Sequence, residues 1–102
     1  YRYWRDDHGS LVKSVSGDIG ACRYVQSHTV LPKLNSLMIE SRGLAEPYDG
    51  ITEVWWESHE ELERGLSSVA GIEAQKKLIE DESRFIDFSR SRVFMTEEQE
   101  IF

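Results

Sequence analysis

Three side chains that can carry a proton lie where the hydrophobic pattern favours an inward position, and His8 is the first of them. On a helical wheel of about 100° per residue, His8 falls in one narrow stripe with Trp4, Leu11 and Val15. The other three members of the stripe are apolar. An imidazole titrates near neutral pH and can take up and return a proton during a reaction. His8 is therefore a candidate general acid or base.

Glu82 interrupts a second apolar stripe, on a helix predicted over residues 71–88. It falls about 40° from Leu78 on the wheel, inside a stripe formed by Leu78, Ile79, Phe85 and Ile86. Buried carboxylates are rare unless they are paired. If both helices cover the same face of a sheet, Glu82 can meet His8. The alternative is a structural pair, or a local partner such as Arg84.

His28, the third candidate, ends a predicted strand, "ACRYVQSHTV", which is rich in β-branched and aromatic residues. Alternation places Tyr24, Gln26 and His28 on one face of this strand, but it does not tell which face meets the helices. For one inward histidine, the simpler interpretation is a hydrogen-bonded core residue. Two inward histidines in so small a domain favour a functional role.

These positions predict one partly apolar pocket between sheet and helices, with His8, His28 and Glu82 as its catalytic groups. The side chains expected to bind a substrate there are Trp4, Tyr24, Gln26 and Trp56. Aromatic rings suit a flat apolar ligand, although by default they form core. The remaining histidine, His59, lies among glutamates at the start of a helix and is predicted to be exposed.

The predicted elements fit a single α+β domain over residues 1–102. The first half comprises a helix to about Gly17, a strand over 21–30, a short helical excursion or ordered loop over 33–43, and a strand over 51–57. The second half comprises a helix capped by Ser58 and Glu61, a break or bend at Gly71, the helix over 71–88, and a last strand or extended arm over 91–102. One more strand in front completes the β-α-β-β-α-β order of the split βαβ, ferredoxin-like unit. We therefore expect a further strand before Tyr1.

Composition and motifs exclude several function classes. The net charge of −7 argues against a nucleic-acid or anionic-membrane binder, and no apolar run approaches the ~20 residues of a membrane span. The single cysteine, Cys22, fits a reducing cytosol. The spacing of histidines and cysteines predicts no metal site, and neither a glycine-rich phosphate loop nor a serine nucleophile elbow is present.

Four segments, "YRYWRDDHGSLV", "RYVQSH", "YDGITEVWW" and "DESRFID", resemble the EthD domain family in that order. The resemblance implies a dimeric α+β barrel, in which two ferredoxin-like sheets pack face to face, and a homodimer that needs no cofactor. The family's namesake is associated with degradation of a fuel ether, and fungal relatives are dehydratases, decarboxylases or cyclases of aromatic polyketides. The chain departs from the family pattern at Gly9 and Ser10, where proline often follows the histidine.

Two functions follow as hypotheses. The first is a cytoplasmic, cofactor-independent enzyme that transfers protons on a small hydrophobic or aromatic compound. The second is a non-catalytic small-molecule binding or accessory protein that uses the same pocket. Two titratable groups in contact at a pocket favour the enzyme, whereas a sealed core around them favours the binding protein. In either case, a sheet with helices on one side leaves Trp55 or Trp56 for a second copy to cover.

Overall fold

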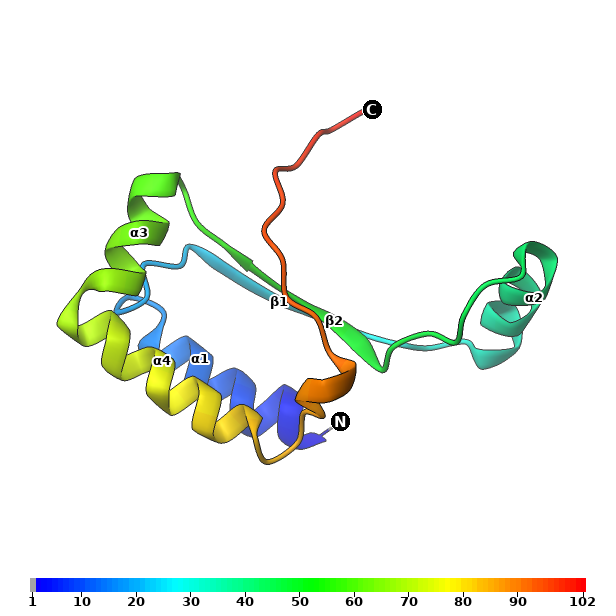
Figure 1. Ribbon diagram of the computed structural model, residues 1–102, viewed down its shortest axis with the longest axis horizontal. Coiled ribbons are helices and arrows are strands. Elements are labelled where there is room, and N and C mark those ends of the chain that lie inside the picture. Colours follow the sequence, from blue (N-terminus) through cyan, green and yellow to red (C-terminus); the bar gives the residue numbers. More distant parts are fainter. Residues whose placement is uncertain (1) are drawn as a thin grey trace.

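The chain folds into helices that cover one face of a two-stranded antiparallel sheet (Figure 1). The computed structural model describes residues 2–102. The strands are β1 (Arg23–His28) and β2 (Gly50–Trp55); the helices are the π-helical η1 (Tyr3–His8), α1 (Gly9–Val15), α2 (Pro32–Arg42), α3 (His59–Ser67), α4 (Val69–Glu82) and the 3-10 turn η2 (Phe88–Arg90). This confirms the predicted α+β class and is consistent with part of a ferredoxin-like fold. The strand expected before Tyr1 lies outside the described residues.

The sheet register settles which strand face meets the helices. Tyr24 pairs with Val54 and His28 with Gly50, so these four residues share one face. That face is the inner one, because Tyr24 packs against the hydrophobic core and Gln26 donates a hydrogen bond to a main-chain oxygen of η1. The two strands therefore present Tyr24, Gln26 and His28 to the helices.

The core lies between α1 and α4, which run side by side beneath the strands (Figure 1). Its buried members are Val12, Val15, Ile19, Ala74 and Leu78. His8 shares its face with Val12 and Val15, rather than with Leu11, which is half-buried. The Gly9 N–H also bonds back to Trp4 O over five residues, and this π-helical turn shifts the phase of Trp4 relative to the residues of α1.

Helix α3 ends and α4 begins on either side of Ser68, so the prediction of a break or bend at Gly71 was wrong in its position. The Ser68 hydroxyl caps α4 by accepting a hydrogen bond from the Gly71 N–H. Ser58 caps α3 in the same way, as predicted, and accepts from the Glu61 N–H. Gly71 is needed for close packing instead, because a Cβ there would lie 1.7 Å from Gly65 O.

The end of the chain also differs from the prediction. Helix α4 ends at Glu82 and not near Phe88, because the chain turns after Ser83 and brings Phe85 back against Tyr3 and His8. Ile79, placed in the apolar stripe by the sequence, is 55% exposed. Residues 91–102 form an extended arm and include no strand. This matches the second of the two forms expected for the tail.

Helix α2 projects away from the rest of the domain at the far end of the strands (Figure 1). Of the two forms expected for residues 33–43, a helical excursion or an ordered loop, the structure shows the helix. Gly43 ends it, as predicted, in the left-handed conformation at φ 62°. Leu34 and Leu37 on this helix are exposed. None of the helices within residues 2–102 combines the length and apolar character that a membrane crossing requires.

Candidate functional site

The His8 imidazole is buried between η1 and α4 and is paired with Asp81. Its Nδ1 lies 2.7 Å from Asp81 Oδ2, and the two residues are only 4% and 6% exposed. The other Asp81 oxygen, Oδ1, accepts hydrogen bonds from the Tyr3 hydroxyl and from Arg84 Nη1, the latter at 3.1 Å. Both oxygens of this buried carboxylate are therefore hydrogen-bonded.

Glu82 lies on the opposite side of the same imidazole. Its Oε2 is 3.6 Å from His8 Nε2, and its side chain keeps 29% of its exposure. The structure thus brings together His8 and Glu82, as the sequence predicted. Because Glu82 follows Asp81 directly in α4, the two carboxylates reach the two nitrogens of one ring from a single turn of helix.

Burial and hydrogen bonding act on the two carboxylates in opposite directions. Burial alone would raise the pKa of Asp81, but hydrogen bonds from Tyr3, His8 and Arg84 outweigh it and hold that pKa below its ordinary value. Burial raises the pKa of Glu82 above its ordinary value, and the attraction of His8 offsets only part of the rise. Glu82 therefore holds a proton more readily than an ordinary glutamate, whereas Asp81 stays ionised.

Phe85 completes the surroundings of the imidazole. Its ring meets the His8 ring edge-on, with centroids 5.0 Å apart, and contacts the Tyr3 ring at 5.6 Å. Aromatic rings at these distances attract one another and exclude water from the pair. Of the two carboxylates that face His8, Glu82 is the one that keeps substantial exposure.

A second polar group lies on the inner face of β1, against η1. Gln26 Nε2 donates to Trp4 O at 2.8 Å and to the Tyr24 hydroxyl at 2.9 Å, and its Oε1 lies 2.8 Å from His28 Nε2. The His28 ring lies against the Trp4 ring, with centroids 4.0 Å apart and the two ring planes tilted by 42°. Gly50 makes room for this indole, because a Cβ there would lie 2.5 Å from Trp4 Cη2. Trp4, Tyr24, Gln26 and His28 form one connected group.

The predicted site residues thus fall into two groups and one outlier. Helix η1 links the groups, since Trp4 belongs to the second group and His8, one turn later, to the first. Trp56 joins neither of them: its Nε1 donates to Ile19 O at 2.8 Å. It lies six residues beyond Gly50, the partner of His28, and one residue past the end of β2, which is about 20 Å of extended chain. His59 is exposed, as predicted.

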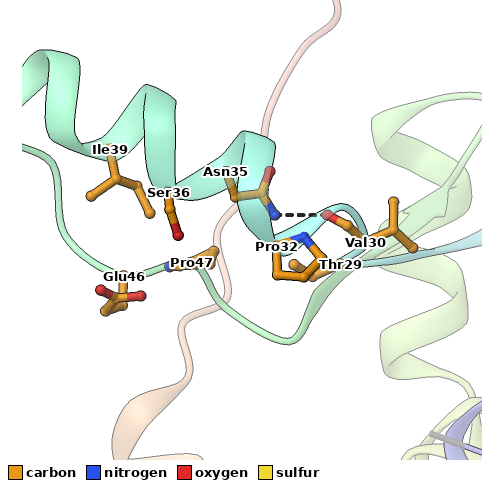
Figure 2. Close-up of a pocket in the computed structure, with 8 residues that line it drawn as sticks. All are labelled: Thr29, Val30, Pro32, Asn35, Ser36, Ile39, Glu46 and Pro47. Atoms are coloured by element: carbon orange, nitrogen blue, oxygen red, sulfur yellow. Dashed lines mark hydrogen bonds between the residues drawn. The ribbon is translucent and has the colours of Figure 1, made fainter.

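An open hollow of about 290 Å³ lies elsewhere, between α2 and the segments that flank it. Figure 2 shows its lining, with Asn35 Nδ2 donating to Val30 O at 2.7 Å and Pro47 closing the other side. The hollow includes none of the predicted site residues. Within residues 2–102, no cluster of three or more His, Cys, Asp or Glu side chains has the arrangement of a metal site.

The sequence interpretation missed Asp81 and Tyr3. The signal for Asp81 was present, because it falls about 60° from Leu78 on the wheel, beside the buried Ala74. No pattern marked Tyr3, whose role depends on the packing of α4 against η1.

The fold and the site define a small α+β domain with a buried histidine held between two carboxylates. The EthD domain family model matches residues 1–89, so the chain belongs to the EthD domain family. The matched range contains both groups of site residues. No curated protein and no solved structure gives a significant match.

Proposed function

We propose that this EthD-domain protein catalyses cofactor-independent proton transfer on a small hydrophobic or aromatic compound, in a reaction of the dehydratase, cyclase or isomerase type. The observation that carries the proposal is the buried His8, whose two nitrogens face two carboxylates of different proton affinity. Perturbed titratable groups gathered around one imidazole are typical of acid–base sites.

The chemistry needs no oxidant or reductant. His8 Nε2 removes a proton from a carbon beside a carbonyl group, and the electron pair of the broken C–H bond forms an enolate. The imidazole then returns the proton to another carbon, or to a departing hydroxyl group that leaves as water. Glu82, partly exposed at 3.6 Å from Nε2, exchanges this proton with the solvent or with the ligand.

The second group supplies the binding surface in this proposal. Trp4 and Tyr24 offer aromatic faces for a flat ligand, and Gln26 fixes the His28 ring through Nε2. His28 acts as the second acid or base, at the end of the ligand away from His8. Trp56 is bound to the chain at Ile19 and is left out of the ligand site.

Native mass spectrometry of the purified protein tests for a co-purifying ligand of this class. Hydrogen exchange in D₂O, followed by proton NMR, then tests the reaction on that ligand and on 2-tetralone, a flat aromatic ketone with acidic C–H bonds. We expect exchange above the buffer rate, reduced roughly 10²-fold or more by His8→Asn. His59→Asn, at an exposed position, is the matched control, and the compounds should exchange with it at the wild-type rate. Exchange at the buffer rate with both compounds would contradict the proposal.

One observation favours the alternative, a non-catalytic binding or accessory protein of a catabolic pathway. His8 is 4% exposed and Phe85 lies against its ring, which is the sealed arrangement expected of a structural pair. A ligand that co-purifies, binds at Trp4 and His28, and shows no exchange would support this function over the enzyme.

We also propose that the protein is a cytoplasmic homodimer whose copies pack through the outer faces of their sheets. The outer face carries Val25 and Ile51, the latter 61% exposed, and Trp55, whose buried Nε1 has no hydrogen-bond partner within residues 2–102. Sedimentation at micromolar concentration should show a dimer that Ile51→Lys dissociates. Leu37→Lys, at a position 64% exposed on α2, should leave the dimer intact. A wild-type monomer would refute this assembly.

A further inference from the structure

Asp81 is hydrogen-bonded in a way that leaves the neutral His8 ring only one tautomer. An ionised carboxylate accepts hydrogen bonds and donates none. Asp81 is held ionised by its donors, so the His8 nitrogen at 2.7 Å from Oδ2 must carry the hydrogen. In the neutral ring the proton therefore sits on Nδ1, and the lone pair sits on Nε2, the nitrogen that faces Glu82.

The carboxylate is itself fixed in place. Oδ1 accepts from the Tyr3 hydroxyl on η1 and from Arg84 beyond the end of α4, which leaves Oδ2 for His8. Rotation of the carboxylate would break these contacts in a site where Asp81 is 6% exposed and water does not replace them. The orientation of the His8 imidazole thus depends on Tyr3 and Arg84, the two donors that hold the Asp81 carboxylate in place.

We propose that Asp81 is the positioning residue of this site, which holds His8 as the Nδ1–H tautomer and presents the Nε2 lone pair to Glu82 and the ligand. The proposal rests on the proposed function for its catalytic meaning. The tautomer of the His8 ring, however, can be measured without any assay of activity. Asp81 acts through His8 and does not itself meet the ligand.

Asp81→Asn separates positioning from bulk structure because it keeps the size and shape of the side chain. Arg84 can only donate, so it selects the oxygen of the new side-chain amide as its acceptor. The amide nitrogen then faces His8 Nδ1 and donates to it. Nδ1 becomes the acceptor, and the proton moves to Nε2, where it blocks the lone pair needed for proton abstraction.

The experiment is a long-range ¹H–¹⁵N correlation spectrum of the ¹⁵N-labelled full chain, recorded over a pH series that includes the neutral form of the ring. Wild type should show His8 as the Nδ1–H tautomer, and Asp81→Asn should show Nε2–H. The matched control is Glu73→Gln, an exposed carboxylate on the same helix that pairs with Lys76 and not with Arg84, and it should keep the wild-type tautomer. In the exchange assay, Asp81→Asn should lower the exchange rate roughly 10²-fold or more, and Glu73→Gln should leave it unchanged.

Two results would overturn the proposal: an Nε2–H tautomer in the wild type, or an Nδ1–H tautomer retained in folded Asp81→Asn. If the Asp81→Asn variant does not fold, the wild-type spectrum alone decides. A wild-type protein with the Nδ1–H tautomer and no exchange activity on any ligand would instead refute the proposed function and leave the positioning by Asp81 standing.

Discussion

Gly65→Ala should destabilise the protein strongly, because α3 packs against the main chain of Ile19 at this position. A Cβ on Gly65 would lie 1.8 Å from Ile19 O and 2.3 Å from its carbonyl carbon. Carbon and oxygen atoms in protein contacts stay about 3.3 Å apart, so the two main chains must separate by about 1.5 Å. Neither side of this contact is a flexible side chain that could rotate away.

The cost follows from two contributions. Overpacking of a tight contact costs about 1–3 kcal/mol, and the upper end applies where main chain must move. The same movement pulls Ile19 O from Trp56 Nε1, now at 2.8 Å, and a lost hydrogen bond costs about 1 kcal/mol. The free energy of unfolding should fall by about 3–4 kcal/mol. For a domain near 100 residues, that lowers Tm by roughly 15–25 °C.

Urea and thermal unfolding, followed by tryptophan fluorescence at one fixed protein concentration, measure this change. Gly17→Ala is the matched control, since a Cβ at Gly17 meets nothing within 4 Å. It should change the unfolding free energy by less than about 1 kcal/mol. A Gly65→Ala variant within about 0.5 kcal/mol of wild type would refute the close approach of α3 to Ile19, and with it the packing that carries α4 to His8.

Three further predictions concern the two site groups. The free energy of unfolding of Glu82→Gln should increase relative to that of wild type as pH rises. Burial raises the pKa of Glu82 in the folded protein, so wild type loses stability as pH rises from the unfolded-state pKa of Glu82, near 4.5, through its folded-state pKa. Urea unfolding at pH 4 and pH 8 measures this gain, and a constant difference would contradict it. Gly9→Ala should raise the unfolding free energy by about 0.5–1 kcal/mol, because the added methyl makes only ordinary contacts in a helix. Destabilisation in the same assay would contradict the helical placement of Gly9. Gly50→Ala should push the Trp4 ring off His28, which NMR would detect as a lost ring-current shift of the His28 protons; an unchanged shift would contradict the ring contact.

The sequence predicted most of what depends on local pattern. The periodicity of apolar residues placed His8 and Glu82 on facing helical stripes, and the structure brings them to 3.6 Å. The alternation of β1 placed Tyr24, Gln26 and His28 on one face, and hydrogen bonds join them there. Both patterns depend on the fixed geometry of a single element, which the sequence determines directly.

What the sequence missed depends on how elements meet. A π-helical turn shifts the phase between Trp4 and α1, where Val12 and Val15 are buried and Leu11 packs against the core only partly buried. The packing of α4 against η1 brings Tyr3 onto Asp81, a contact that spans 78 positions of the chain. Trp56 alternates onto the predicted face, yet it lies at the other end of the strand from His28. Periodicity gives the face of a residue but not its position along that face.

The central claim is that His8 and Glu82 act together in moving a proton. A double-mutant cycle in the D₂O exchange assay tests it most directly, with His8→Asn, Glu82→Gln and the double variant measured against wild type. We predict that each single change lowers the exchange rate, and that the double variant is no slower than the His8→Asn protein, because the two groups work on the same proton. Losses that multiply in the double variant, or a Glu82→Gln protein as fast as wild type, would contradict the claim.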